Sequence, residues 1–278
     1  MNRITMRVPG GRVRAFTMSY DDGVEQDIRL ISIMKKRAVK GTFNLNSGLY
    51  APEGTVYPAG QVHRRMTREM CLKTYDPSIC EVAVHGSKHP FWNRQPEGAR
   101  MLDIIEDRRQ LEKDFGRIIR GAAYPYGAYD EATVQTLKSA GIVYCRTVNS
   151  THSFALPDNW LALNPTCHHD DKMLFELTDR FLAAGSAEEP QLFYLWGHSY
   201  EFEQYDHWNV IEECLERVGG IADVWYATNI EVYDYVKAYR SLIYNAEGNT
   251  VYNPTDKEVW LTVDGMTHAI GAGECRSI

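Results

Sequence analysis

Two pairs of polar residues follow apolar runs in this chain, and their types could do hydrolytic chemistry. Asp21 and Asp22 end the run that begins at Ala15. His85 ends a second run, and His89 follows it four positions later. One carboxylate and two imidazoles can bind a divalent metal, and the remaining carboxylate can act as a general base. The residues therefore predict a metal-dependent hydrolytic site, and they leave open which aspartate is the ligand and which is the base.

The elements that must position these residues alternate between β-type runs and segments of helical period. The predicted strands are 13–20, 41–46, 81–85, 121–125, 142–148, 192–197 and 222–228. The clearest helix between them has one apolar face, formed by Met101, Ile104, Ile105, Leu111, Phe115, Ile118 and Ile119. Further helices are predicted after Asp130, Asp170, Asp206 and Asn229, the first of them stopping at Gly141.

Seven strands that alternate with helices predict parallel strands joined by right-handed crossovers. We therefore expect a (β/α) barrel, incomplete and of about seven strands, with a doubly wound sheet as the alternative. In parallel barrels the catalytic groups sit at the C-terminal ends of the strands. The polar candidates all fall at such positions: Asp21, Asp22, His85, Tyr124, Tyr126, Arg146 and His198. They are expected to converge on one rim.

Two regions depart from this alternation. Residues 50–77 form a long insertion with Pro and Gly near its start, and loops of that length often shape a binding cleft. Near the C-terminus, a strand over 258–263, a turn at Asp264-Gly265 and a return strand over 267–270 predict a hairpin. We predict a barrel domain over residues 1–240 and a small C-terminal β appendage over residues 241–278, packed on the barrel.

The composition is that of an ordinary globular protein, with 278 residues, 44% apolar and 24% charged. The net charge of -7 argues against nucleic acid or an anionic membrane as the main partner. No apolar run approaches the ~18 to 20 residues of a membrane span. The first six residues lack the apolar core of a signal peptide, and the six cysteines include no Cys-x-x-Cys. We therefore expect reduced thiols in a cytoplasmic protein.

Four segments at the predicted strand ends match the motifs of one known family. Thr-Phe-Asp-Asp-Gly appears as Ser19-Tyr20-Asp21-Asp22-Gly23, His-Ser/Thr-x-x-His as His85-Gly86-Ser87-Lys88-His89, Arg-x-Pro-Tyr-Gly as Ala123-Tyr124-Pro125-Tyr126-Gly127, and Leu-x-x-His as Leu195-Trp196-Gly197-His198. The second strand, Gly41-Thr42-Phe43-Asn44-Leu45-Asn46, is similar to Ala-Thr-Phe-Phe-Val. Over roughly residues 12–238 the chain therefore resembles the polysaccharide deacetylase family, also called the NodB homology domain or carbohydrate esterase family 4.

The resemblance implies a metal bound by Asp22, His85 and His89. Zinc is the expected cation, and cobalt, nickel or iron would suit the same nitrogen and oxygen ligands. A zinc-type ion with three protein ligands keeps open positions for water and substrate, lowers the pKa of its water to about 7 and polarises the acyl oxygen. Among the two aspartates, the resemblance thus makes Asp22 the ligand.

The remaining roles concern proton transfer. The resemblance implies that Asp21 is the general base for the attacking water and that His198 is the general acid for the departing amine. It also implies that Tyr126 lends its backbone N–H to the oxyanion. A single acid–base partner of this kind contributes on the order of 10² to 10⁴ in rate.

One motif residue is missing from this set. Ala123 stands where the family has the arginine that holds the base aspartate. Arg146, on the next predicted strand, is expected to reach Asp21 from a different direction. A solvent-facing Arg146 is the alternative.

A second motif, Asp followed by Trp, is degraded to Asp158-Asn159-Trp160. The partner that orients His198 is therefore expected to be Asp158 or Asp170. Trp160 is still expected to line the substrate groove, and Tyr124 and Leu195 are the other expected substrate-binding residues.

Two further polar groups lie near these positions. Glu201 and Glu203 follow His198, where they could orient the imidazole, meet a polar substrate or lie on a solvated helix. Cys167, His168 and His169 resemble part of a metal site. We do not expect a second metal there, because no matching ligand pair lies nearby in sequence.

The function predicted from these residues is a metal-dependent hydrolase that removes acetyl groups from N-acetylated amino sugars. Its expected partner is an N-acetylated carbohydrate, with no nucleic acid and no membrane span. An amide hydrolase acting on a small non-sugar substrate is one alternative, since a cell-wall deacetylase would normally be exported. A carbohydrate-binding protein that has lost turnover is another alternative, and the intact aspartates and histidines argue against it.

Overall fold

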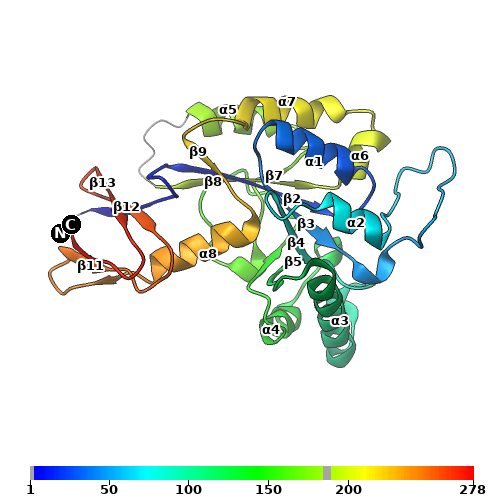
Figure 1. Cartoon of the computed structure of the whole chain (residues 1–278), viewed down its shortest axis with the longest axis horizontal. Helices are drawn as coiled ribbons and strands as arrows, with labels where there is room; N and C mark the ends of the chain where they lie inside the picture. Colours follow the sequence, from blue (N-terminus) through cyan, green and yellow to red (C-terminus); the bar gives the residue numbers. More distant parts are fainter. Residues whose placement is uncertain (1–2, 184–188) are drawn as a thin grey trace.

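The computed structural model describes residues 3–183 and 189–278, and its main element is an open sheet of eight parallel strands (Figure 1). In sheet order the strands are β6 (Tyr144–Arg146), β5 (Gly121–Ala123), β4 (Cys80–Val84), β3 (Gly41–Leu45), β2 (Arg14–Asp21), β8 (Gln191–Gly197) and β7 (Cys167–His168), and β9 (Val224–Tyr226) pairs with the start of β2. Within the described residues β6 and β7 do not pair, so the sheet curves without closing. This is the incomplete (β/α) barrel that the alternation predicted.

The sheet has one more strand than predicted. All seven predicted strands are present, and the additional strand is β7, which pairs with β8 through Cys167 and His168 alone. A strand of two residues is too short to show alternation in the sequence. The next two strands of the sheet, β8 and β2, are almost fully buried. Helices cover both faces of a parallel sheet, so its strands read as continuous apolar runs.

Eight α-helices and four short 3₁₀-helices in the described residues connect and cover the strands. The α-helices are α1 (Asp27–Lys36), α2 (Arg68–Thr74), α3 (Glu97–Phe115), α4 (Glu131–Ser139), α5 (Leu174–Ala183), α6 (Ser199–Gln204), α7 (Trp208–Val218) and α8 (Asn229–Arg240). The 3₁₀-helices are η1 (Ser47–Leu49), η2 (Trp92–Arg94), η3 (Pro125–Gly127) and η4 (Trp160–Ala162). Figure 1 shows α1, α5 and α7 on one side of the sheet and α3 and α4 on the other. No helix in this part of the chain combines the length and the apolar character needed to cross a membrane.

Helix α3 begins and ends earlier than its apolar period predicted. The predicted face runs on to Ile118 and Ile119, but the helix ends at Phe115 and Gly116 adopts a left-handed conformation with φ 64°. Glycine takes this conformation without a steric penalty, so it ends the helix as a C-terminal cap. Beyond the cap Ile118 is exposed and Ile119 is buried.

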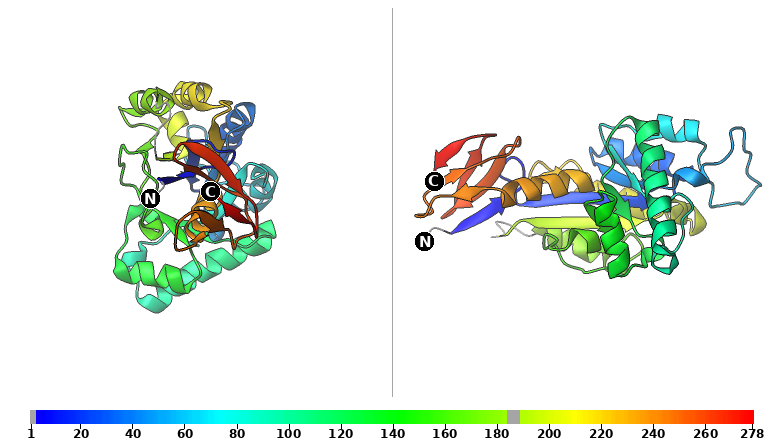
Figure 2. Two further views of the ribbon diagram at one scale, coloured as in Figure 1. Left: turned by 90° about the vertical axis from the view of Figure 1, so that its left-hand side faces the viewer. Right: turned by 90° about the horizontal axis from the view of Figure 1, so that it is seen from below.

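The C-terminal β region consists of two small antiparallel sheets at the end of the molecule that carries both termini (Figures 1 and 2). Its strands are β1 (Ile4–Arg7), β10 (Ile243–Tyr244), β11 (Thr250–Tyr252), β12 (Val259–Val263), β13 (Met266–Ile270) and β14 (Cys275–Ser277). The hairpin of β12 and β13 turns at Asp264 and Gly265. Because β1 pairs with β12, this region also includes the first strand, which the sequence analysis placed in the barrel domain.

Glu81 is a buried carboxyl near the start of β4, at the opposite end of the strand from His85. Its Oε2 accepts hydrogen bonds from Thr42 Oγ1 at 2.8 Å and from the Ile230 amide at 2.9 Å. Its Oε1 accepts one from the Tyr144 hydroxyl at 2.6 Å. Burial outweighs these three donors and raises the pKa of Glu81 to about 7.

We predict that Glu81 makes the stability of the fold depend on pH. Between its usual pKa of 4.5 and about 7, the folded state holds a proton that the unfolded state has lost. The resulting stabilisation is complete below pH 4.5 and is lost as the pH rises through 7. Relative to Glu81→Gln, the unfolding free energy of the wild type should fall by about 3 kcal/mol between pH 4.5 and 8, measured by urea denaturation.

The matched control for this measurement is Glu176→Gln, which changes an exposed glutamate of α5. Its pH profile should follow that of the wild type. Parallel profiles for the wild type and Glu81→Gln would contradict the prediction.

Candidate active site

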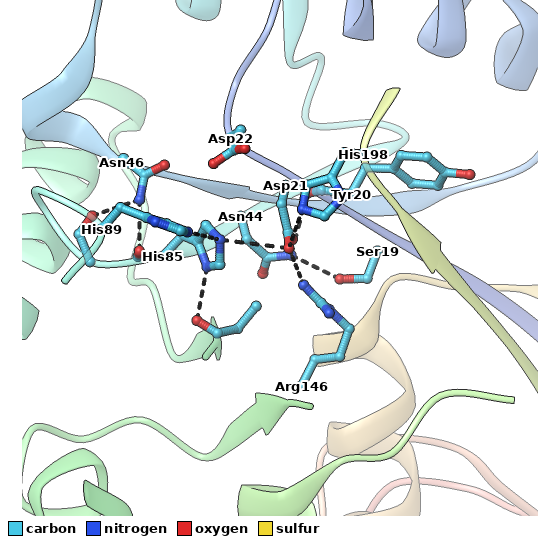
Figure 3. Close-up of polar contacts among 12 residues, drawn as sticks. Ser19, Tyr20, Asp21, Asp22, Asn44, Asn46, His85, His89, Arg146 and His198 are labelled. Atoms are coloured by element: carbon cyan, nitrogen blue, oxygen red, sulfur yellow. Dashed lines mark hydrogen bonds and ion pairs between the residues drawn. The ribbon is translucent and has the colours of Figure 1, made fainter. Parts of the chain in front are cut away.

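The C-terminal ends of the strands surround a pocket of about 530 Å³. It is lined by residues from strand ends and from two loops: Asp21, Asp22, His63, Arg65, His85, His89, Tyr124, Tyr126, Gly127, Val148, Trp196, His198 and Tyr200. The residues that the sequence placed at strand ends thus meet at one rim. Figure 3 shows Asp21, Asp22, both pocket histidines of the second motif and His198 directed toward one another.

Asp22, His85 and His89 form a group that can hold a metal ion. Each offers one ligand atom, and these atoms lie within 4.8 Å of one another. His85 Nδ1 lies 3.0 Å from the carbonyl oxygen of Ala123. When Nδ1 carries the proton and donates it to this carbonyl, the lone pair of Nε2 is free to bind a cation. That Nε2 is 3.1 Å from His89 Nε2. The arrangement of two imidazole nitrogens and one carboxylate oxygen fits a zinc-type cation with open positions.

The protonation of the two histidines agrees with a metal site. Burial lowers the pKa of His85, although the nearby charges of Asp21 and Asp22 oppose this effect. Burial and the neighbouring His85 lower the pKa of His89 to about 4. Both imidazoles are therefore neutral near pH 7, which is the form that binds metals.

The main chain bends sharply where these groups enter the pocket. Asp22, His89 and Tyr126 adopt positive φ angles of 83°, 52° and 59°. Non-glycine residues adopt such angles at an energetic cost, and the surrounding structure must hold them there. For Asp22 one such support is the hydrogen bond from its amide to the carbonyl of Asn44.

His85 is held by partners on other elements. Asp107, a fully buried residue of α3, accepts a hydrogen bond from the His85 amide at 3.1 Å through Oδ2. The other oxygen of Asp107 accepts from the amide and the hydroxyl of Ser47, at 2.7 and 2.6 Å. Asn46 Nδ2 donates to the carbonyls of His85 and Gly86. These contacts fix the main chain from which the imidazole projects.

Asp21 lies between the metal group and His198. Its Oδ2 is 3.6 Å from His85 Nε2 and 3.7 Å from His198 Nε2. Its Oδ1 accepts a hydrogen bond from Asn44 Nδ2 at 2.8 Å. Burial acts to raise the pKa of Asp21, but the charge of Arg146 and the two histidines outweighs it, so the pKa is lowered. Asp21 is therefore an anion beside the candidate metal position.

Arg146 reaches Asp21 as the sequence predicted. The guanidinium is fully buried, contacts Asp21 Oδ2 and lies 4.5 Å from the centre of the Trp196 ring. Its strand explains the contact, because Arg146 is the register partner of Ala123 in the pairing of β5 with β6. The arginine has therefore moved to the neighbouring strand at the same level, and the contact with Asp21 shown in Figure 3 follows.

The two aspartates predicted to orient His198 are wrong, whereas Glu201, the other residue considered from the sequence, does lie beside it. Asp158 is fully exposed and pairs with Arg240, and Asp170 pairs with other histidines. The structure instead places Glu201 Oε2 3.3 Å from His198 Nδ1. The first turn of α6 brings the two residues together, because residues three apart in a helix share a face.

The environment of His198 favours its protonated form. Burial acts to lower the pKa of His198, but Glu201 and the charges of Asp21 and Asp22 outweigh it and raise the pKa. His198 therefore carries a proton more readily than an ordinary histidine. Its Nε2 faces Asp21 and the pocket, and its Nδ1 faces Glu201.

The sequence analysis did not identify two further side chains at Asp22. Arg65 and His63, from the insertion 50–77, lie 3.0 Å and 3.2 Å from the Asp22 carboxylate oxygens. Burial acts to raise the pKa of Asp22, but the hydrogen bond from His63 and the charges of His85 and Arg65 outweigh it, so the pKa is lowered. The long insertion therefore does shape the cleft, as its length predicted.

The predicted substrate-binding residues occupy different places. Tyr124 lines the pocket, but it is buried and its hydroxyl donates to the carbonyl of Leu161. Leu195 is buried in the core and Trp160 packs on Tyr233 of α8, so neither is among the residues that line the pocket. The rings that do line it include Tyr126, Trp196 and Tyr200.

Some of the missed residues carried a signal in the sequence. Asn44 and Asn46 alternate with apolar residues in a buried strand, which marks one face of that strand as polar. Asp107 lies three residues after Ile104 and four before Leu111, on the buried face of its helix. Arg65 and His63 lie in an irregular loop, where no period predicts the direction of a side chain.

Comparison with known proteins agrees with this architecture. Residues 10–145 match the family model described as polysaccharide deacetylase. The matched segment contains Asp21 and all three residues of the candidate metal group, Asp22, His85 and His89. Residues 10–145 are therefore similar to polysaccharide deacetylases, as the motifs predicted. A search of curated proteins found no match.

Two solved structures of low sequence identity share the fold, and a third aligns less well. A proposed polysaccharide deacetylase from Mycobacterium smegmatis aligns with a TM-score of 0.60 and 18% identity over 86% of this chain and 96% of that one. The Xyl-CE4 domain of a multidomain xylanase from the hindgut metagenome of Trinervitermes trinervoides aligns with a TM-score of 0.52 and 15% identity over 84% and 98%. Streptococcus pyogenes deacetylase PplD in complex with acetate has a TM-score of 0.45 and 19% identity, and 52% of this chain covers 61% of it.

The support that Asp107 gives to His85 yields a prediction. In Asp107→Asn one acceptor oxygen becomes an NH₂ group that faces donors, so the main chain of His85 is less firmly held. Zinc affinity, measured by titration calorimetry, should fall by about 10- to 100-fold. Glu106→Gln alters the neighbouring exposed residue of the same helix and should leave the affinity unchanged. Equal affinity in the two variants would contradict the prediction.

Proposed function

We propose that the protein is a metal-dependent hydrolase that removes acetyl groups from N-acetylated amino sugars. One observation carries this proposal: Asp21 lies between His85 of the candidate metal group and His198, 3.6 and 3.7 Å from their Nε2 atoms. An anionic carboxylate and an imidazole with a raised pKa thus lie side by side in the pocket. Amide hydrolysis needs both, because water must lose a proton and the leaving amine must gain one.

The residues of the chain divide this work. Asp22, His85 and His89 would hold the cation, with zinc as the first choice and cobalt, nickel or iron as others. A cation bound there would lower the pKa of a water and polarise the acyl oxygen. Asp21 accepts the proton of the attacking water, and Arg146 keeps Asp21 ionised for this purpose. His198 donates a proton to the amine, and Glu201 orients its ring.

The pocket also offers a surface for a sugar ring and a donor for the oxyanion. Tyr126 is half exposed, and its ring stacks on Phe91 at 3.9 Å between centroids. Tyr200 contacts the rings of His63 and His198 on another part of the lining. We assign the backbone N–H of Tyr126 to the oxyanion, since its positive φ turns the main chain at the pocket wall.

The partner of this site is then an N-acetylated carbohydrate. The cytoplasmic location that the cysteine pattern indicates, and the division into a barrel domain and a C-terminal β appendage, remain predictions. All six cysteines are free thiols, five of them buried.

The proposal is tested by acetate release from a panel of N-acetylated monosaccharides, N-acetylated oligosaccharides, O-acetylated sugars and small non-sugar amides. Release from at least one N-acetylated sugar is expected with added zinc or cobalt, and EDTA should abolish it. If acetate is released from the small amides alone, the proposed substrate class is wrong and the enzyme acts on non-sugar amides. Binding of sugars without release from any compound would remove the deacetylase function.

The two aspartates should respond differently to the same substitution. Asp21→Asn removes the base but no ligand, so turnover should fall by at least about 10²-fold while the metal content stays unchanged. Asp22→Asn removes a ligand and should lose the metal. Metal content is measured by inductively coupled plasma mass spectrometry after gel filtration. Metal loss in Asp21→Asn with retention in Asp22→Asn would exchange the two roles.

The role of Arg146 is tested by moving the arginine from β6 to position 123 on β5, where the family motif has it. Arg146→Ala leaves Asp21 buried without its cation, which should cost about 3 to 5 kcal/mol of stability and lower kcat. The double variant Ala123→Arg/Arg146→Ala places the arginine one strand away at the same level and should recover part of both losses. The unfolding free energy and kcat are measured for each variant.

Arg146→Lys serves as the control, because it keeps a positive charge near Asp21 without the planar guanidinium. It should retain more stability than Arg146→Ala. Wild-type kcat in Arg146→Ala would show that Asp21 does not need this arginine.

A further inference from the structure

A second group of histidines and carboxylates lies behind His198, outside the residues that line the candidate active site. It combines the end of β7, the loop that follows and the first turn of α6. We call it the β7 cluster, and its members are His168, His169, Asp170 and Glu201. Each member offers one ligand atom, and the four atoms lie within 4.8 Å of one another.

His169 is the buried centre of this cluster. The residue is fully buried, and its Nε2 has no hydrogen-bond partner among the described residues. That nitrogen faces two carboxylates, with Glu201 Oε2 at 3.4 Å and Asp170 Oδ1 at 3.5 Å. The Tyr20 hydroxyl lies 3.3 Å from Nδ1 and can accept its proton, which leaves a lone pair on Nε2. A cation between this buried lone pair and the two carboxylates would satisfy all three groups.

The ring of His169 has no freedom to turn away from these carboxylates. It stacks on the Tyr20 ring and packs against Phe202, with its centroid 4.2 Å from that ring. Its amide donates to the carbonyl of Trp196, and a Cβ at Gly197 would collide with its Nδ1. The position of Nε2 is therefore fixed before any ligand binds, and a preorganised donor loses little conformational entropy on binding.

The spacing of the ligand atoms fits a tetrahedral cation. Ligands at about 2.0 to 2.1 Å from a zinc-type ion lie about 3.3 to 3.4 Å from one another. The distances from Glu201 Oε2 to His168 Nε2 and His169 Nε2 are 3.3 and 3.4 Å. Direct hydrogen bonds would be shorter, with a usual N–H···O distance of about 2.9 to 3.0 Å.

The two flanking histidines differ in how readily they could bind. His168 Nδ1 accepts the amide of Asp170 at 3.1 Å, so its neutral ring carries its proton on Nε2. To bind a cation through Nε2, His168 must carry its proton on Nδ1 instead, and the hydrogen bond from the Asp170 amide must then break. His207 Nε2 lies 3.1 Å from Asp170 Oδ1 on the outer side of the cluster. His169, Asp170 and Glu201 are therefore the core ligands, with His168 as the fourth.

We propose that the β7 cluster is a second cation site, suited to zinc or another transition metal that prefers imidazole and carboxylate ligands. The site is distinct from the group of Asp22, His85 and His89, and it does not depend on the proposed function. The sequence predicts no second metal here, because no matching ligand pair lies nearby in the chain. The missing ligand is Glu201, which comes from a different element and lies 32 positions after His169 in the chain.

One carboxylate links the β7 cluster to His198 of the pocket. Glu201 Oε2 is 3.3 Å from His198 Nδ1 and also belongs to the β7 cluster. A cation in the cluster would therefore act as a positioning element for His198 through Glu201, without entering the pocket itself.

The test is the number of zinc ions bound by each full-length variant, measured by inductively coupled plasma mass spectrometry and by calorimetric titration. The wild type should bind two zinc ions per chain. Asp170→Asn should bind one, because it removes a core ligand at a partly exposed position where folding is not at risk. His89→Ala should also bind one, and the double variant none. His168→Ala should weaken the second site less than Asp170→Asn does.

The matched control is Asp171→Asn, because the Asp171 carboxylate bonds to His152 and not to the cluster. It should retain two zinc ions. Cobalt substitution adds a spectroscopic readout, in which the wild type shows two sets of visible bands and each single-site variant keeps one set. One zinc ion in the wild type, lost in His89→Ala and kept in Asp170→Asn, would overturn the proposal. Loss of that single ion in Asp170→Asn alone would support the β7 cluster and overturn the first site.

Discussion

The site depends on burying two adjacent carboxylates at the end of the central strand β2. Taking a carboxylate out of water costs several kcal/mol unless a positive charge or several hydrogen-bond donors accompany it. Asp21 and Asp22 are both buried, and each has its own cation, Arg146 for one and Arg65 for the other. Two other parts of the rim meet the same requirement. Asn44 on β3 donates a hydrogen bond to Asp21, and the insertion 50–77 brings Arg65 and His63 to Asp22.

The two compensating arginines come from different kinds of element, which suits the different roles proposed for the two aspartates. Arg146 lies on a strand, is fully buried and holds its carboxylate in a fixed position. Arg65 and His63 lie on a loop and reach Asp22 from the solvent side of the pocket. A general base must be held rigidly beside the reacting water. If Asp22 binds the cation, the cation replaces contacts that Arg65 and His63 now make with its carboxylate. The geometry therefore agrees with Asp21 as base and Asp22 as ligand.

The convergence of the site residues on one rim was predicted from strand periodicity. Parallel strands end at one rim, so Asp21, His85 and His198 could be placed together without knowing any contact. The same periodicity explains an error. Trp196 lines the pocket, and Leu195, its neighbour in β8, points to the opposite face and into the core. Leu195 and Trp196 are both apolar and both buried, so the residue types alone could not decide which of them lines the pocket.

The residues that the sequence could not place are those whose partners lie on irregular segments. Asp170 was a reasonable candidate for orienting His198, because both follow strands that pair side by side. The helix α6 decides otherwise, since its first turn puts Glu201 closer to His198 than any loop residue of β7. Asp170 is then left beside His169 and His207. Asp170 therefore belongs to the β7 cluster and does not orient His198. Glu201 lies beside both His198 and the cluster, and so it connects the cluster to the pocket.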